Sequence, residues 1–284
     1  MTEIDIPHKV RPEKPRSRLF NLAKLSLALL VAWLVLPLLP LALWSFSRSW
    51  YFPDLLPSDY SWRAWEYALS STSGVPQAIL RTILIAVATT ILSVIVGVPA
   101  GRALGLYQFR GKALIEVLVL APMVIPGIAV ALGLHVVFLK LGLAGSLIGV
   151  MIVHLIPTLP YMILVMAGVF ANYNPAAESQ ARSLGASALK AFYYITLPAI
   201  LPGILIGSIF VFLVSWSQYI LTLLIGGGRV ITLPLLLFNF ATSGRNDITG
   251  AIGMIYILPG IVLLLFAARY LSGRNMSAGN LGQI

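Results

Sequence analysis

Residues 178–198 read ESQARSLGASALKAFYYITLP, a polar stretch between two strongly apolar segments. Asn174 and Pro175 come just before it and form an N-cap and first-turn pair, so a helix is predicted to begin there. Gly185 predicts where this helix ends, because glycine adopts the left-handed backbone conformation that commonly closes a helix.

A second short helix is predicted to follow, capped by Ser187 and running through Tyr194. Pro198 and Pro202 then predict a turn into the next apolar segment. Two interpretations of this helix pair stay open on physical grounds. It could lie on the lipid surface as an interfacial amphipathic helix, or it could dock onto a cytoplasmic partner.

The composition places the rest of the chain in a membrane. Of its 284 residues, 59% are hydrophobic and 10% are charged, whereas soluble domains carry about 25% charged residues. The absence of cysteine excludes disulfides, thiol nucleophiles and cysteine–zinc sites. The net charge of +10 is spread over the loops between apolar runs, which indicates membrane topology rather than nucleic-acid binding.

Uncharged runs locate the predicted membrane spans. A helix needs about 20 apolar residues to cross the hydrocarbon core. The long runs 141–177 and 191–228 each hold one span and adjoining loop. The sequence therefore predicts an all-α integral membrane protein with six transmembrane helices, at about 23–46, 77–101, 114–138, 146–170, 200–224 and 250–271.

Lysine and arginine predict the orientation. With the N-terminus inside, 13 of the 19 basic residues lie on the inner side and 6 on the outer side. Both termini and the stretch 178–198 are then cytoplasmic. We expect an uncleaved first helix rather than a signal peptide, because its apolar run exceeds the usual 7–15 residues. The predicted organisation is a cytoplasmic segment 1–22, a permease domain 23–271 and a cytoplasmic tail 272–284.

Prolines and glycines are frequent within the predicted spans. Each has two interpretations of equal weight, an ordinary kink with close helix packing or a bend that lines a pathway. The clusters at 122–127 and 157–160 favour the pathway.

The stretch 178–198 resembles the cytoplasmic signature of permease subunits of binding-protein-dependent ABC importers. That signature reads E-A-A, three residues, G, nine residues, I-x-L-P. The residues that match it in register are Ala181, Gly185, Ile195, Leu197 and Pro198.

Two positions depart from the signature. Ser179 and Gln180 stand where the family has Glu-Ala, and the nearest acid, Glu178, lies one position earlier. The polar contacts to a partner are therefore expected to differ. Four further stretches, 80–104, 120–134, 154–170 and 214–237, resemble successive helices of these permeases, the last in the branch that includes polyamine permeases.

The resemblance implies a type I ABC importer permease fold, with a cytoplasmic helix–turn–helix coupling loop at 174–198. It also implies alternating access in the plasma (inner) membrane, with ATP-binding subunits, a second permease of different sequence and an external solute-binding protein as partners. This chain would bind no cofactor itself, since ATP belongs to the partner subunit. The implied ATPase-coupling residues are Glu178, Ala181, Leu184, Gly185, Ala186, Ile195, Leu197 and Pro198.

The sequence itself agrees with a non-catalytic role. It contains no G-x4-G-K-[ST] phosphate loop, and residues 226–228, Gly-Gly-Gly, lack the lysine and are predicted to form a turn. No metal-ligand, paired-carboxylate or nucleophile–base pattern stands out. A membrane enzyme is therefore disfavoured.

Other polar residues in or beside the spans are candidates for a translocation path or for packing. His135 and His154 are expected to be neutral, hydrogen-bonded packing residues rather than functional groups. Glu116 is predicted to pair with Lys112, four residues earlier. Four residues could face the path or could join helices by hydrogen bonds: Ser215, Ser217, Gln218 and Asn239.

An ion-coupled secondary transporter or channel is the alternative function. Such carriers usually hold acids near the bilayer midplane, whereas every Asp and Glu here lies in a loop or at a span end. The sequence does not identify the transported solute. Polyamine permeases tend to carry an acid just after the serine of the fifth helix, where this chain has Gln218 after Ser217. An organic cation is the first candidate for the solute, followed by phosphonates and thiamine-like solutes.

Overall fold

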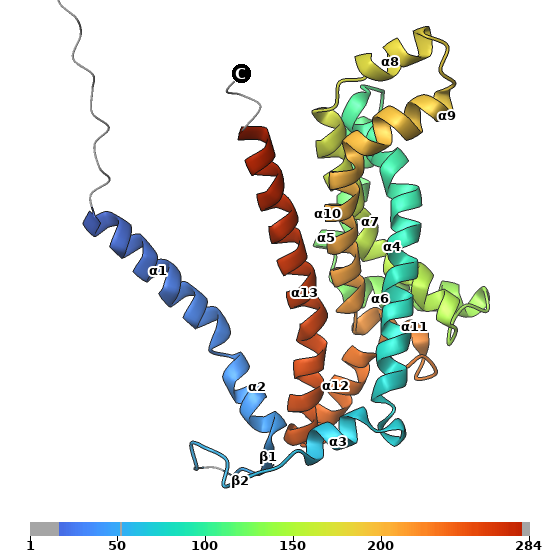
Figure 1. The fold of residues 1–284 in the computed structure, drawn as a ribbon. Coiled ribbons are helices and arrows are strands. Elements are labelled where there is room, and N and C mark those ends of the chain that lie inside the picture. The colour runs from blue at the N-terminus through green and yellow to red at the C-terminus, as the bar shows by residue number, and fades with distance from the viewer. Residues whose placement is uncertain (1–16, 52, 280–284) are drawn as a thin grey trace, which may run out of the picture.

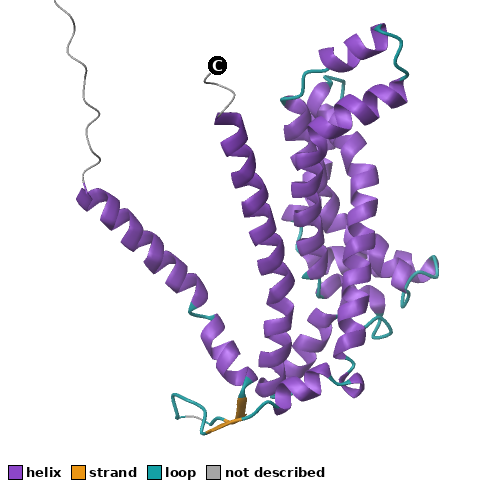
Figure 2. Ribbon diagram, in the orientation of Figure 1, coloured by secondary structure: helices purple, strands orange, loops and turns teal. Residues whose placement is uncertain are grey.

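The computed structural model describes residues 17–51 and 53–279, and most of them are helical (Figure 2). The predicted terminal segments lie partly outside this range, at residues 1–16 and 280–284. Within the described residues, the strands are confined to one short antiparallel hairpin, β1 (Ser47–Ser49) with β2 (Asp59–Tyr60). The all-α character predicted from composition is confirmed.

The helices follow one another with short connections. In chain order they are α1 (Ser17–Val35), α2 (Leu38–Ser45), α3 (Arg63–Leu69), α4 (Val75–Leu106), α5 (Lys112–Val124), α6 (Gly127–Lys140), α7 (Leu147–Ala171), α8 (Ala176–Ser183), α9 (Ala188–Ala191), α10 (Leu197–Trp216), α11 (Ile220–Gly226), α12 (Leu233–Thr242) and α13 (Asn246–Gly279). A 3-10 turn at Ser71–Ser73 joins α3 to α4, and a π-helical turn at Phe192–Thr196 joins α9 to α10.

Four continuous helices in the described part of the chain are long and apolar enough to span a membrane. They are α4, α7, the run from α9 through α10, and α13. Two further pairs qualify only as bent spans, α1 with α2 at 43° and α5 with α6 at 103°. The prediction of one continuous span at 114–138 is therefore wrong in its geometry, and the count is six only if each bent pair is one span.

Pro126 explains the sharp bend between α5 and α6. It lacks the amide hydrogen that would continue the helix, and its backbone is non-helical with φ −55° and ψ 129°. Ile125 before it is extended, with φ −73° and ψ 131°, as residues preceding proline prefer to be. The predicted span 200–224 is likewise broken, because α10 ends at Trp216 and α11 begins at Ile220.

The centre of the bundle is the contact between α4 and α7. Gly97, Gly101 and Gly105 lie one turn apart on α4, and a Cβ at any of them would collide with α7. Glycine thus lets the two backbones approach closely, as small residues do in membrane helix pairs. Met162 and Met166 of α7 are fully buried there, and α10 covers the same cluster through Ile200 and Val211.

Figure 1 shows how the ends of the bundle are arranged. The segment α8–α9 lies at the same end as the start of α1 and the end of α13, whereas the hairpin, α3 and α12 lie at the opposite end. A chain that crosses a membrane an even number of times produces this arrangement. At the hairpin end, α2 crosses α13 so closely that a Cβ at Gly250 would meet the backbone of Leu41 and Ser45.

Candidate functional site

The segment 174–198, called the coupling segment below, begins nearly as its sequence predicts. The side-chain Oδ1 of Asn174 accepts a hydrogen bond from the Ala176 amide at 2.9 Å, which satisfies one of the free amides of the first turn of α8. Glu178 lies in that first turn. The Asn174 side chain thus binds an amide at the helix start as expected, but the helix begins one residue later than predicted, with Pro175 at the N-cap position.

Gly185 closes α8 in the way the sequence predicts. Its φ of +92° is in the left-handed region, where a side chain is strained. The Gly185 amide donates to the Arg182 carbonyl at 3.0 Å, and the Ala186 amide donates to the Ala181 carbonyl at 3.0 Å. This pair of bonds is the Schellman arrangement, so the turn between α8 and α9 has a defined geometry.

The second helix differs from its prediction. The Ser187 hydroxyl accepts from the Lys190 amide and caps α9 as expected. No turn follows at Pro198, however, because the chain runs without interruption from α9 through the π-helical turn into α10. The Leu197 amide donates to the Phe192 carbonyl, the i to i−5 bond of a π-helix. This wider turn directly precedes Pro198, which has no amide hydrogen to donate.

Large apolar and aromatic side chains of the coupling segment are exposed at the end of the bundle. Leu184 is 90% exposed, Leu189 is 77% exposed, and Tyr193 and Tyr194 are also exposed. We call these four residues the coupling patch. Exposed apolar groups gathered in this way mark a surface that another protein or a membrane covers. A polar groove of about 500 Å³ lies beside the patch, between α8 and α9, and is lined by Ser179, Arg182, Ser183, Ala186, Ser187 and Ala188.

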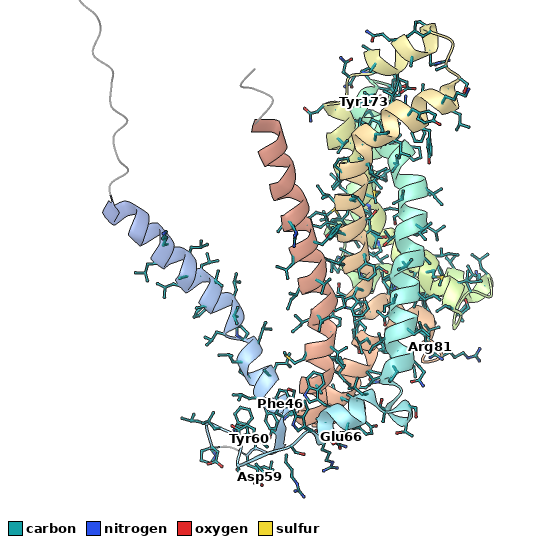
Figure 3. The ribbon with its side chains drawn as sticks, in the orientation of Figure 1. Phe46, Asp59, Tyr60, Glu66, Arg81 and Tyr173 are labelled. Carbon is teal, nitrogen blue, oxygen red and sulfur yellow. The ribbon has the colours of Figure 1, made fainter. Side chains whose placement is uncertain are left out.

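Glu178 turns away from this surface and into the bundle. Its carboxylate accepts two hydrogen bonds from Arg102 Nη2 of α4, at 2.9 and 3.2 Å, and one from the Thr196 hydroxyl at 3.0 Å. Thr196 is buried and shares a further hydrogen bond with Tyr173 Oη at 3.0 Å. Tyr173 is labelled in Figure 3 at the end of the bundle beneath α8 and α9. Arg102 also lies over the ring of Phe170, 5.9 Å from its centre.

The remaining coupling residues predicted from the sequence are partly half-buried and partly exposed. Ala181 and Ala186 are half-buried, as are Ile195 and Leu197, while Pro198 is exposed. The structure thus brings Glu178 together with α4 and leaves Leu184 as the most exposed residue of the coupling patch. Arg102 was not identified in the sequence as a site residue, because nothing local relates it to a residue 76 positions later.

The candidate path residues do not form one group. Ser215 is buried and shares a hydrogen bond with Nδ1 of His154 at 2.9 Å. Nε2 of the same imidazole shares a hydrogen bond with the Thr222 hydroxyl at 2.9 Å. His154 of α7 therefore joins α10 to α11, and in this structure Ser215 has the helix-joining role that was its alternative. The expectation that His154 is a hydrogen-bonded packing residue is confirmed.

A cavity of about 610 Å³ lies where the break between α10 and α11 faces α12, α13 and α2. Its lining residues are Leu41, Ser217, Tyr219, Pro234, Leu237, Phe238, Ala241, Thr249, Gly253, Tyr256 and Ile257. We call it the aromatic cavity. Of the four path residues predicted from the sequence, Ser217 lines it. Gln218 is half-buried and Asn239 is exposed, and neither lines the cavity.

Three aromatic residues of this cavity were missed by the sequence analysis. The rings of Tyr219 and Phe238 lie 4.6 Å apart, and Tyr256 stacks on Trp216. They come from the helix break, from α12 and from α13, so their spacing in the sequence carries no pattern. A tyrosine at a break in an apolar helix was the available signal.

Two other expectations concern charged or ionisable residues. Lys112 Nζ lies 3.9 Å from Glu116 Oε1, so that predicted pair is confirmed. His135 is half-buried and its Nδ1 has no hydrogen-bond partner in the described part of the chain, which differs from the expected packing role. No group of three or more His, Asp or Glu side chains that could hold a metal is found among residues 17–51 and 53–279.

Comparison with known proteins assigns the chain to a family. Residues 97–276 match the family described as "Binding-protein-dependent transport system inner membrane component". The chain belongs to this family. The matched region holds the coupling segment, the α4–α7 contact from Gly97 onward and most of the lining of the aromatic cavity.

Curated relatives of the permease align along most of its length. The spermidine/putrescine transport system permease protein PotC of Haemophilus influenzae is 26% identical over 248 residues, covering 87% of this chain and 95% of the relative. The putrescine transport system permease protein PotI of Escherichia coli K12 is 27% identical over 246 residues, covering 84% and 86%.

The fold of the permease is also found in a solved structure. A chain of a bacterial ABC transporter involved in the import of the acidic polysaccharide alginate superposes with a TM-score of 0.69 over 92% of this chain and 99% of that chain, at 20% identity. The permease thus has the ABC importer permease fold and is a permease subunit of an ABC importer of the inner membrane.

Proposed function

We propose that the permease forms half of the translocation path for a small organic cation of the polyamine class. The observation that carries this proposal is the alignment with two permeases named for spermidine or putrescine transport, over 84–87% of this chain. In this proposal an external binding protein delivers the solute, which is consistent with a family described as binding-protein-dependent.

The aromatic cavity supports an organic cation as the solute. The faces of Tyr219, Phe238 and Tyr256 carry negative charge density, which attracts ammonium groups. The aliphatic lining, such as Leu41 and Ile257, suits the methylene chain between two ammonium groups. The hydroxyl groups of Ser217 and Thr249 can accept hydrogen bonds from them.

The same cavity has no acidic residue in its lining. A polyamine would therefore be held there by ring faces and hydroxyls rather than by ion pairs. Weak holding suits a path, because a solute must enter a site and also leave it. The binding protein outside would then supply most of the affinity.

The coupling segment is proposed to dock onto a separate ATP-hydrolysing subunit on the cytoplasmic side. Leu184 and Leu189 supply the exposed apolar contact that such an interface needs at its centre. Both termini lie on that side in this proposal, with six spans, and a second permease of different sequence completes the path. The 13 to 6 distribution of basic residues supports this orientation.

Uptake by the purified complex tests the proposed solute. Proteoliposomes with ATP inside and the loaded binding protein outside should accumulate radiolabelled putrescine or spermidine in the presence of a protonophore. Excess unlabelled polyamine should compete, and a phosphonate should not. Uptake of an anionic solute with no response to polyamines would overturn the cation proposal. Uptake by the permease alone, driven by an ion gradient, would instead indicate a secondary carrier.

A further inference from the structure

A buried histidine connects the two helices on either side of the break beside the aromatic cavity. Nδ1 of His154, in α7, shares a hydrogen bond with Ser215 near the end of α10, and Nε2 shares one with Thr222 in α11, each at 2.9 Å. All three side chains are buried, so these bonds are shielded from competing water. One imidazole ring therefore connects α10 to α11 across residues 217–219, where the helix is broken.

The direction of the two hydrogen bonds follows from a neighbouring contact. The Thr222 hydroxyl donates its proton to the Gln218 carbonyl at 3.1 Å, so its oxygen accepts from Nε2 of His154. A neutral imidazole with its proton on Nε2 is an acceptor at Nδ1, and Ser215 is therefore the donor there. The donors form one chain, which starts at the end of α10 and finishes at a carbonyl inside the break.

The helix after the break depends on its surroundings for its position. α11 has only 7 residues, and so short a helix is not stable through its own hydrogen bonds. Leu221 and Ile225 pack its apolar side against α6 and α7. Apolar packing is non-directional, whereas a rigid, planar imidazole ring holds two hydroxyl groups at defined positions. The histidine thus supplies the contact that fixes the rotation of α11 relative to α10.

The position of His154 is fixed in turn by the centre of the bundle. The Thr158 hydroxyl, one turn later on α7, donates to the His154 carbonyl at 2.7 Å. Thr158 also shares a hydrogen bond with the Ser93 hydroxyl of α4 at 3.3 Å, and both residues are buried. The turn of α7 that carries the imidazole ring is therefore tied to α4, on the side away from the break.

We propose that His154 is the positioning residue of the aromatic cavity, because its two hydrogen bonds hold the break at residues 217–219 in place. The break supplies Ser217 and Tyr219 to the cavity lining. The Tyr219 ring lies 4.6 Å from the ring of Phe238 in α12, so a rotation of α11 would separate the two rings. The role of the cavity in transport rests on the proposed function, whereas the positioning of the break does not.

The test places a cysteine in the break and follows its reactivity. The complete transporter with Ser217→Cys, in lipid nanodiscs, is treated with aminoethyl methanethiosulfonate, and the rate of modification of this chain is measured by mass spectrometry. Adding Thr222→Val, which removes the hydroxyl and keeps the shape of the side chain, should change this rate by about fivefold or more. Thr89→Val is the matched control, because Thr89 is an equally buried threonine that donates to the Met151 carbonyl of α7 instead. The control should change the rate by less than about twofold.

Two substitutions of His154 separate positioning from general stability. His154→Gln can still donate to Thr222 from its amide and should keep the rate within about twofold, whereas His154→Leu should change it as much as Thr222→Val does. A role in stability alone would lower the melting temperature and leave the reactivity of the cysteine unchanged below it. If His154→Leu does not assemble, the comparison of Thr222→Val with Thr89→Val decides. Equal rates in those two threonine variants, or equal effects of the two His154 variants, would overturn the proposal.

Uptake by the same variants tests the link to the proposed function separately. If the cavity lies on the path, Thr222→Val should change the ratio of putrescine to spermidine uptake by about fivefold, with ATPase association unchanged. A changed cysteine reactivity with unaltered uptake of both solutes would support the positioning role of His154 and contradict the place of the cavity on the path. Unchanged reactivity would overturn the positioning role whatever the uptake.

Discussion

Arg102 of α4 and Glu178 of α8 are joined by a contact of 2.9 Å across 76 residues of sequence. The side chains are 28% and 13% exposed, so the pair is shielded in part from water. Glu178 also accepts a hydrogen bond from Thr196 in the π-helical turn. One carboxylate therefore connects α8 with α4 and with the helix that becomes α10. A displacement of α8 by a partner would pull on both.

Neutralising Glu178 is the first test of this connection. Glu178→Gln keeps the size of the side chain and removes its charge, so assembly and ATP hydrolysis should persist while uptake per ATP falls by about fivefold. The measurement is the ratio of solute uptake to phosphate release in proteoliposomes. Glu116→Gln is the control, because Glu116 is more exposed and its pair with Lys112 is looser.

Exchanging the charges of Arg102 and Glu178 is a stricter test of the same connection. Arg102→Glu with Glu178→Arg should recover part of the uptake that either single change removes. Equal uptake per ATP in Glu178→Gln and in the unaltered complex would show that the pair does not transmit movement.

Gly185 is the second test, because its φ of +92° is unfavourable for any other residue. Alanine there should cost about 1–2 kcal/mol and a β-branched residue more. No atom lies within 4 Å of an added Cβ, so the effect would come from the backbone alone. Gly185→Val should insert normally, fail to retain the ATPase subunit in co-purification, and lose uptake.

A glycine in a regular helix is the control for that substitution. Gly168 of α7 also has open space around an added Cβ and no positive φ. Gly168→Ala should leave ATPase association unchanged. Full association of Gly185→Val would mean that the angle between α8 and α9 is not needed for docking.

The coupling patch can be tested by placing charge in it. Leu184→Asp with Leu189→Asp should abolish ATPase association, because an unpaired charge at the centre of an interface is strongly disfavoured. Leu55→Asp is the control, since Leu55 is 91% exposed and belongs to the hairpin end. Normal co-purification of the double variant would place the docking surface elsewhere. Ala186 and Phe192 are half-buried and lie outside the patch as defined. Ala186→Asp with Phe192→Asp should lower uptake per ATP, because it places charge where the coupling segment is expected to be apolar.

Topology can be tested directly because the chain has no cysteine. Ser187 and Ser243 are both exposed, the first at the cap of α9 and the second at the end of α12. With an impermeant thiol reagent outside intact cells, Ser243→Cys should label and Ser187→Cys should label only after lysis. Labelling of both in intact cells would contradict the proposed orientation.

The close approach of α4 and α7 predicts a stability effect. A side chain at Gly101 would overlap Met166 Cβ and press on the α7 backbone at 3.0 Å. Gly101→Val should therefore destabilise the permease by about 1–3 kcal/mol or more and lower its melting temperature in detergent. Gly133→Val, at a position with open space around an added Cβ, is the control. Equal melting temperatures would show that α7 can shift to make room.

Local signals in the sequence predicted local structure well. Asn174, Gly185 and Ser187 each fix a helix end through atoms within a few residues, so their roles could be inferred before the fold was known. The pairing of Lys112 with Glu116 is local in the same sense. The all-α membrane class followed from composition, which does not depend on how the helices pack.

Whether a helix bends or continues at a proline could not be inferred with the same success. Pro126 and Pro198 both lack an amide hydrogen, yet the first accompanies a 103° bend and the second follows a π-helical turn in a continuous helix. The difference depends on what packs around each one, which a single sequence does not reveal. The links from Arg102 to Glu178 and from His154 to Ser215 depend on packing in the same way.

The uninterrupted helix from Ala188 to Trp216 has the geometry of a lever arm. Its 29 residues extend about 43 Å at 1.5 Å per residue, from the coupling patch at one end to the aromatic cavity at the other. A tilt of about 10° around the end that carries the coupling patch would displace the far end by about 7 Å, comparable to the width of a solute. The swing of a single rigid arm could thus open or close the path beside Ser217 while the cavity lining itself is hardly remodelled.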